Sequence, residues 1–168
     1  VCTTPNPRHL STEHYFRFSE RFRRKFLPRT IELGRSFVQP AYQARGNAKS
    51  IYALDNLWDG LGALIVLNPK AKYLFGKVTM YSSYQTVARN TLIYFLHKYF
   101  PDRDRLVTGR HPIDLGLDDP YYERIFTGEN YVENYHILIQ RIREFNENIP
   151  PLINSYMNLS PTMRVFDT

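Results

Sequence analysis

Residues 38–48 form the segment of this sequence best suited to bind an anion. The segment contains Gln43, Arg45, Gly46 and Ala48 and lies between an expected strand and an expected helix. Where a strand ends in a tight turn of small residues, the free N–H groups of the next helix point toward one place, which suits a phosphate. Gly46 and Ala48 let the backbone approach such a group closely, and Gln43 and Arg45 add donors. Taken alone, the pattern also fits an ordinary strand-to-helix turn.

Elsewhere the sequence lacks the spacing of a metal or nucleophile site. The five histidines include no His-x-x-x-His pair, and the single Cys2 excludes a zinc site made of thiolates. The acidic stretches at 102–104 and 118–119 could attract a cation, but solvated loops explain them more simply. We therefore expect no metal cofactor. No Ser-His-Asp or Cys-His spacing is present either, so nothing in the sequence indicates a nucleophilic catalytic side chain.

The elements expected around the 38–48 segment alternate between strand and helix. Several of them end at a proline, which stops a helix or strand by removing a backbone donor. Strand, helix and strand in this order form a right-handed crossover unit with parallel strands. The expected elements are a strand over 31–38, a helix over 48–67, a strand over 73–80 and a helix over 83–100.

The regions on either side of this unit have a different character. Residues 11–28 predict a short basic amphipathic helix, because phenylalanines recur every fourth residue among several arginines. Residues 102–128 are polar, rich in glycine and proline and without a period, so they predict a long loop. The remaining sequence predicts a helix over 131–146 and two short strands, over 152–159 and 163–166.

The composition is that of a globular protein, and its net positive charge favours an acidic partner. Its 168 residues, 43% hydrophobic and 15% aromatic, exclude intrinsic disorder and are enough for one core. The longest mostly apolar stretch, 57–67, is too short for a membrane span, no secretory leader is evident, and one cysteine fits a reducing compartment. The 22 Lys and Arg outnumber the 16 Asp and Glu, so the net charge is +6. This charge favours nucleic acid, an anionic membrane, a phosphate-bearing cofactor or an acidic carrier protein.

Val38-x-Pro40 followed by Gln43-x-x-Gly46-x-Ala48 resembles motif A of the GNAT acyltransferase superfamily, whose loop binds the pyrophosphate or phosphopantetheine of an acyl donor. Three further stretches, at 32–38, 57–62 and 73–76, resemble the ornithine-lipid and glycine-lipid N-acyltransferases, a branch also called hemolysin-like. Glu32-x-x-Arg35 is similar, more distantly, to the acyl-homoserine-lactone synthases. The resemblance covers residues 31–100 well and continues weakly through 150–156.

The resemblance implies an α/β (α+β) fold, with a GNAT-like mixed central sheet and flanking helices. The first N-terminal strands and the last strand of the superfamily are not evident here. We therefore expect a single GNAT-like acyltransferase domain over residues 1–168, incomplete at both ends.

The resemblance also implies direct acyl transfer, in which an amine attacks the thioester carbonyl. The backbone N–H of Val38 is expected to hold the oxyanion. The phosphopantetheine of acyl carrier protein, or CoA, is expected to bind the 38–48 segment through Val38, Gln43, Ala44, Arg45, Gly46, Asn47 and Ala48.

Two side chains are expected to move protons in that reaction. Glu32, with Arg35 beside it, is the expected base for the ammonium, and Tyr94 is the expected acid for the leaving thiolate, with Tyr84 as its rival. Each has a structural alternative: Glu32 and Arg35 could form an ion pair along the strand, and Tyr94 lies on an apolar helical stripe that suits core packing.

The function implied by the resemblance is transfer of a (3-hydroxy)fatty acyl group from acyl carrier protein to the α-amine of ornithine or glycine, in aminolipid biosynthesis. The expected partners are acyl carrier protein, the amino-acid acceptor and an anionic membrane, contacted peripherally from the cytoplasm, and no nucleic acid. Two alternatives stay open. One is a short-chain acyl-CoA-dependent N-acetyltransferase of the same fold, and the other is a basic nucleic-acid-binding module without enzymatic activity.

Overall fold

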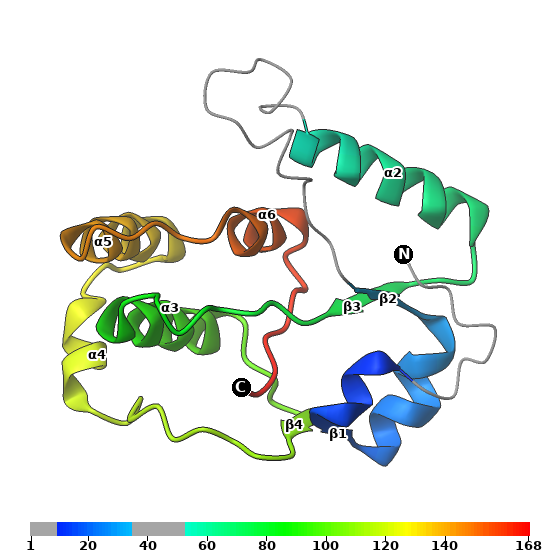
Figure 1. The fold of residues 1–168 in the computed structure, drawn as a ribbon, viewed down its shortest axis with the longest axis horizontal. Coiled ribbons are helices and arrows are strands. Elements are labelled where there is room, and N and C mark those ends of the chain that lie inside the picture. The colour runs from blue at the N-terminus through cyan, green and yellow to red at the C-terminus, as the bar shows by residue number, and fades with distance from the viewer. Residues whose placement is uncertain (1–9, 35–52) are drawn as a thin grey trace. The chain divides into compact units, whose positions relative to one another are not determined.

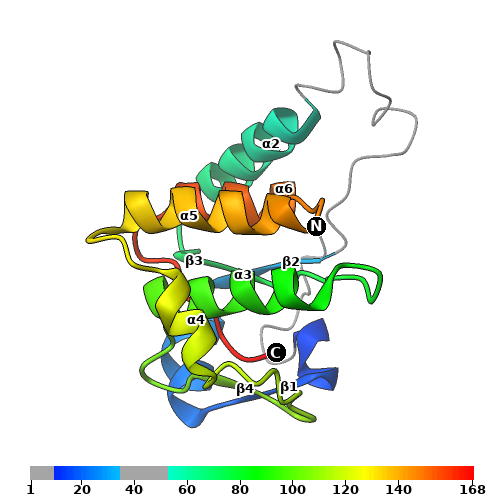
Figure 2. The same ribbon diagram turned by 90° about the vertical axis from the view of Figure 1, so that its left-hand side faces the viewer.

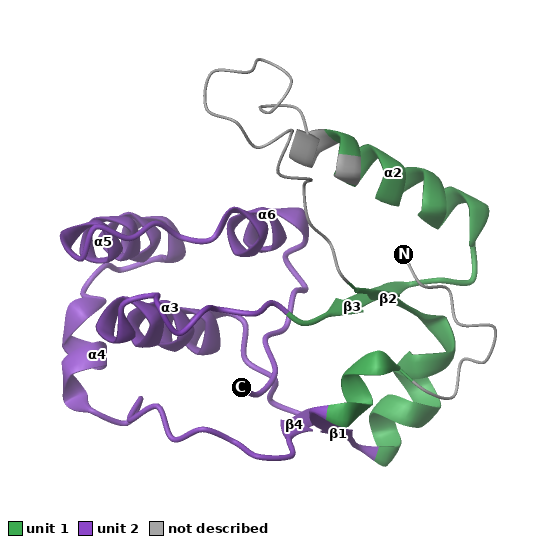
Figure 3. Cartoon of the chain, viewed as in Figure 1, with its two compact units in different colours: residues 1–14, 20–77 green, residues 15–19, 78–168 purple. Residues whose placement is uncertain are grey.

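The computed structural model describes residues 10–34 and 53–168 (Figure 1). The chain divides into two compact units, of which the first comprises residues 1–14 and 20–77 and the second residues 15–19 and 78–168 (Figure 3). Short strands and flanking helices occur in both units, so the expected α+β class is confirmed. The described strands pair as two two-stranded sheets, one in each unit.

The first unit contains the strand-helix-strand arrangement that the sequence predicted. Strand β2 (Thr30–Leu33) and strand β3 (Tyr73–Gly76) are parallel, with Thr30 opposite Tyr73 and Leu33 opposite Gly76. Helix α2 (Ala53–Leu67) connects them along the chain. The parallel pair is confirmed. Strand β3 is shorter than the expected 73–80, and residues 35–38 of the other expected strand lie outside the described part of the chain.

A close backbone approach explains why Gly76 ends strand β3. A Cβ atom at this position would lie 2.7 Å from the carbonyl oxygen of Leu33, which is closer than real Cβ atoms come to backbone. Only glycine lets β2 and β3 keep this separation at their carboxyl ends.

The prediction of one basic helix over 11–28 is wrong. This region forms two 3₁₀ turns, η1 (Ser11–His14) and η3 (Leu27–Arg29), a π-helical turn η2 (Phe22–Phe26), and strand β1 (Phe16–Phe18). Strand β1 pairs with strand β4 (Val107–Gly109) in the second unit. Alternating aromatic residues suit a strand when a partner is available, and that partner is remote in sequence.

Aromatic rings form the centre of the first unit. Phe22 is 3% exposed, and its ring centroid lies 5.9 Å from that of Phe26 and 5.5 Å from that of Phe75. The basic side chains of this region are partly neutralised, since Arg23 pairs with Glu13 at 2.7 Å. Phe22 and Phe26 therefore contribute to a local core of this unit without being part of a continuous helix.

The second unit is built on α3 (Thr86–Tyr99), over which α5 (Tyr131–Glu144) and α6 (Pro151–Leu159) pack (Figures 1 and 2). Helix α4 (Pro120–Ile125) precedes α5. Buried side chains from all four helices form one cluster, which includes Leu92, Phe95, Ile125, Leu138, Ile142, Ile153 and Met157.

Helix caps explain why two helices begin where they do. The side chain of Gln85 accepts a hydrogen bond from the backbone N–H of Ala88 at the start of α3. At the start of α5, Asn130 accepts from the N–H of Glu133, and Glu133 accepts in turn from Asn130 Nδ2. Each cap satisfies a donor that the first helical turn leaves free, so α5 starts at the residue the sequence predicted.

The prediction of strands over 152–159 and 163–166 is wrong. Residues 151–159 form helix α6, in which Pro151 occupies the first turn, where its missing N–H costs nothing. Ile153 and Met157 are buried at a spacing of four, which is the helical period. Of the second expected strand, the structure shows one isolated bridge, between Val165 and Pro101. The expected loop over 102–128 contains β4 and α4.

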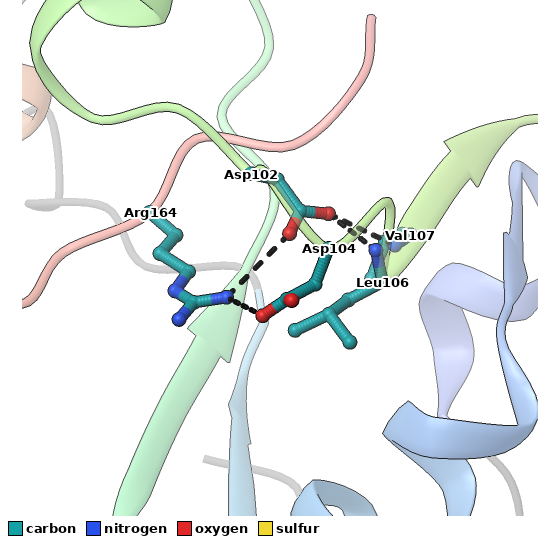
Figure 4. A network of polar contacts seen from close by, with 5 residues as sticks. All are labelled: Asp102, Asp104, Leu106, Val107 and Arg164. Carbon is teal, nitrogen blue, oxygen red and sulfur yellow. Dashed lines mark hydrogen bonds and ion pairs between the residues drawn. The ribbon is translucent and has the colours of Figure 1, made fainter.

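Arg164 links the last residues of the second unit to the loop after α3 (Figure 4). Its guanidinium lies 2.7 Å from Asp104 and 3.7 Å from Asp102. Asp102 also accepts hydrogen bonds from the backbone N–H groups of Leu106 and Val107. The acidic pair that could have attracted a cation is thus occupied by an arginine.

Replacing Arg164 by methionine is expected to lower the free energy of unfolding by about 0.5–1.5 kcal/mol, because the partners are partly shielded from water. Urea unfolding in low and high salt measures this, and salt should reduce the difference. Arg141→Met is the matched control, since Arg141 and Glu144 form an exposed pair. If the two substitutions lowered the free energy of unfolding equally, the Arg164 contacts would contribute no more than an exposed surface pair.

Candidate active site

Glu32 and Tyr94 are the predicted catalytic residues that the structure describes. Glu32 lies on β2 in the first unit, and Tyr94 lies on α3 in the second. Arg35, Val38 and the predicted donor-binding residues 43–48 lie outside the described residues.

The Glu32 carboxylate is buried and fully engaged by one short segment of the same unit. Its side chain is 8% exposed. Oε2 accepts a hydrogen bond from the backbone N–H of Ser11 at 2.8 Å, and Oε1 accepts from the backbone N–H of Thr12 at 3.0 Å and from its hydroxyl at 2.9 Å. These contacts hold the start of η1 against β2.

The contacts of Glu32 decide its charge. Burial raises the pKa of the carboxyl, but the hydrogen bonds from Ser11 and Thr12 outweigh it, so the pKa lies below its ordinary value. A carboxylate that is stabilised in its charged form is a weak base. The structure therefore favours an anchoring task for Glu32, with Ser11 and Thr12 as partners that the sequence did not indicate.

Tyr94 lies half-buried on α3 among other aromatic rings. Its ring stacks on those of Tyr122, at 5.7 Å between centroids, and Phe126, at 5.8 Å. Burial raises the pKa of the phenol, and the nearby carboxylate of Glu123 raises it further, so the hydroxyl keeps its proton at neutral pH. Within the described part of the chain no side chain or backbone group hydrogen-bonds to this hydroxyl.

Tyr84, the rival of Tyr94, already has a partner. Its hydroxyl donates a hydrogen bond to the carbonyl oxygen of Asn148 at 2.9 Å. Burial and the charge of Glu147 raise its pKa to about 12. A proton held this strongly suits a structural bond better than transfer to a leaving group.

A cavity of about 400 Å³ opens beside Tyr94 in the second unit. Helix α3 contributes three side chains to it, Tyr94, His97 and Lys98, at positions three and four apart that share one helix face. Residues from the segment that leads into α4, and from α4 itself, complete the lining: Leu117, Asp118 and Glu123.

His97 is a second cavity residue with a perturbed pKa. Burial lowers its pKa, although Asp167 and a hydrogen bond with the backbone of Phe166 act in the opposite direction. Its Nε2 atom is buried and has no hydrogen-bond partner in the structure as described. The imidazole is therefore neutral at pH 7, and its Nε2 lone pair is available as an acceptor.

The Lys98 ammonium is held in place at the cavity by its own unit. Nζ lies 3.5 Å from the carbonyl oxygen of Phe126, 5.8 Å from the Phe126 ring centroid and 5.9 Å from that of Tyr99. Phe126 thus orders both Lys98 and Tyr94. Cation–π contact of this kind restricts a lysine that would otherwise be mobile.

Tyr94 was singled out from the sequence, whereas His97 and Lys98, which line the same cavity, were not. The available signal was their spacing from Tyr94 on one face of a predicted helix. The acidic residues of the cavity come from a region expected to be a loop, so nothing in the sequence joined them to α3. In residues 10–34 and 53–168, no group of three His, Cys, Asp or Glu side chains could hold a metal ion.

Comparison with known proteins finds two close relatives. The chain is 51% identical over 160 residues to a glycine N(alpha)-acyltransferase of Phocaeicola vulgatus, covering 95% of this chain and 49% of that protein. It is 52% identical over 160 residues to a protein of the same name from Bacteroides thetaiotaomicron, covering 95% of this chain and 48% of that protein. The chain thus spans about half the length of these curated relatives.

Other comparisons add no relative. No protein-family profile matches the chain, and no solved structure matches it. Among the helices that the structure describes, none combines the length and the apolar character needed to cross a bilayer.

Proposed function

We propose that this chain, which is homologous to glycine N(alpha)-acyltransferases, takes part in transferring an acyl group to the α-amine of an amino acid. The observation that carries this proposal is the 51–52% identity over 95% of the chain. The relatives' name supplies the reaction and the acceptor, and the resemblance of residues 31–100 to the lipid branch of the GNAT acyltransferases agrees with both.

The proposed donor is a fatty acyl thioester on acyl carrier protein, with acyl-CoA as the alternative. The net charge of +6 supports an acidic protein partner, since a basic surface attracts it before contact. The proposed acceptor is glycine, as in the relatives, with ornithine as the alternative.

Contact with an anionic membrane is part of the same proposal, because an acylated amino acid is a lipid. Three consecutive apolar residues at the end of α2 are exposed, among them Val66 at 79% and Leu67 at 78%. Lys70 and Lys72 follow within a few residues and are exposed as well. Apolar side chains beside lysines suit the interface of an anionic bilayer.

The proposed chemistry is direct transfer without an acyl-enzyme. The acceptor ammonium loses one proton to a base, and its nitrogen then forms a bond to the thioester carbonyl carbon. The carbon–sulfur bond breaks, and the second proton leaving the nitrogen ends on the departing sulfur. The backbone N–H of Val38 would stabilise the oxyanion, and residues 43–48 would hold the phosphopantetheine.

Tyr94 would act at the leaving sulfur. Its raised pKa keeps the phenol protonated but makes full proton transfer to a thiolate unfavourable, because a thiol is the stronger acid. We therefore assign Tyr94 as a hydrogen-bond donor to the sulfur. Glu32, with Arg35, stays a candidate base, while its contacts support a positioning role first.

Incubation of the full-length protein with a 3-hydroxyacyl carrier protein and a panel of amino acids, followed by mass spectrometry, tests this function. The expected product is N-acylglycine. Turnover with acetyl-CoA and none with long acyl-carrier donors would support the short-chain alternative. A salt-sensitive DNA affinity without acyl transfer would contradict the enzyme assignment.

A further inference from the structure

The cavity beside Tyr94 carries fixed charges of both signs that do not neutralise one another. Lys98 comes from α3, Asp118 from the segment before α4, and Glu123 from α4. None of the three forms an ion pair with another described residue. Because these opposite charges line one cavity without forming ion pairs with each other, the cavity suits a ligand that carries both a positive and a negative charge.

The side chain of Lys98, on the positive side of the cavity, is exposed, but its ammonium contacts two aromatic residues. The carbonyl oxygen and ring of Phe126 and the ring of Tyr99 hold the Lys98 ammonium. Phe126 is itself 4% exposed and belongs to the core. An ammonium placed by core residues loses little conformational freedom when a carboxylate binds to it.

The negative side is ordered by the start of α4. The side chain of Asp119 caps this helix by accepting from the N–H of Tyr121, and Pro120 fixes the first turn. Asp118 precedes this cap, and Glu123 lies one turn into the helix, close enough to Tyr94 for its charge to raise the pKa of the phenol. Both carboxylates therefore line the cavity together with Tyr94.

We propose that this cavity binds the amino-acid acceptor as its zwitterion. Lys98 would pair with the α-carboxylate, Asp118 and Glu123 would receive the α-ammonium, and Leu117 and the Tyr94 ring would supply apolar contact. This inference rests on the proposed function and names the substrate class and the residues that select it.

The side chains that line the cavity indicate the chemistry of its ligand. A free α-amino acid presents one carboxylate and one ammonium a few bonds apart, and each can form a charge-assisted hydrogen bond with a side chain of opposite sign. A fatty acid lacks the cation, and a simple amine lacks the anion. The cavity also places the bound amine near Tyr94, whose hydroxyl is the assigned donor to the leaving sulfur.

The test compares glycine with glycinamide, which keeps the amine and lacks the carboxylate charge. In the full-length protein, Lys98→Met preserves the apolar stem over the two rings and removes the charge. We expect KM for glycine to rise about tenfold or more, KM for the acyl donor to stay unchanged, and the preference for glycine over glycinamide to be lost. The double variant Asp118→Asn with Glu123→Gln should raise KM for glycine and KM for glycinamide by the same factor.

Matched controls separate this effect from general loss of charge. Lys25→Met removes an exposed lysine of the first unit, and Glu144→Gln removes an exposed carboxylate of α5. Both should leave KM for glycine unchanged. Circular dichroism of each variant checks that the fold is kept.

The outcomes distinguish this inference from the proposed function. If the wild-type protein transfers acyl groups and Lys98→Met keeps the wild-type preference for glycine, the cavity is not the acceptor site and the function stands. If the wild-type protein transfers none, the function fails, and equilibrium binding of glycine and glycinamide to wild type and Lys98→Met, measured by saturation-transfer NMR, still decides the inference. Equal binding by both proteins would overturn it.

Discussion

Replacing Phe95 by alanine is expected to lower the free energy of unfolding by about 3–5 kcal/mol. The side chain is 0% exposed, and its ring centroid lies 4.7 Å from that of Tyr99, 5.4 Å from that of Phe126 and 5.6 Å from that of Tyr131. Alanine would lose the transfer free energy of the ring and leave a void among large neighbours that cannot collapse onto it. Urea unfolding followed by circular dichroism measures the change.

The control for this substitution is an exposed aromatic residue of the same unit. Tyr81 is 77% exposed, so Tyr81→Ala should change the free energy of unfolding by less than about 0.5 kcal/mol. Because Phe95 contacts the ring of Phe126, Phe95→Ala should also disturb Tyr94 and Lys98. A loss below about 1 kcal/mol would show that the aromatic cluster is not the core of this unit.

Replacing Glu32 by glutamine is expected to lower the free energy of unfolding by about 1–3 kcal/mol at neutral pH, since the amide nitrogen cannot accept a hydrogen bond. One of the donors from Ser11 and Thr12 would then be buried without a partner. The folded protein lowers the pKa of Glu32 below its ordinary 4.5, so its contribution is present above that pH. It is lost as the pH falls through the lowered pKa.

Unfolding at several pH values and turnover at one low temperature separate the two tasks of Glu32. The wild type should lose more stability between neutral and acid pH than Glu32→Gln does. Glu20→Gln is the control, because Glu20 forms an exposed pair with Arg24 and should have little effect. If Glu32→Gln instead folds with unchanged stability and turns over at least about tenfold more slowly, Glu32 is the general base.

Local signals predicted the elements that local interactions determine. Helix α5 begins as expected because Asn130 and Glu133 cap it within a few residues. The pairing of β2 with β3 followed from the strand-helix-strand order. Helix α6 was missed because the apolar residues of 152–159 were interpreted as a short strand, although the spacing of four between Ile153 and Met157 indicates a helix.

The parts that could not be predicted depend on contacts distant in sequence. Strand β1 pairs with β4, which lies about ninety residues later, and the sequence around Phe16 gives no indication of this partner. The hydrogen bonds to Glu32 come from residues 20 and 21 positions earlier. The cavity beside Tyr94 joins a helix to a segment that sequence analysis assigned to a loop. Each of these needs the tertiary structure before it can be seen.

The contacts of Val165 and Asp167 also affect the order in which this unit can fold during synthesis. Val165 donates to the carbonyl of Phe100, and Asp167 accepts from the N–H of Gly109, so strand β4 and the turn before it gain partners made some sixty residues later. Until those residues have left the ribosome, strand β4 and the turn before it lack these hydrogen-bond partners. A pause in translation before Val165 is added should therefore leave strand β4 and the turn before it accessible to proteases and chaperones.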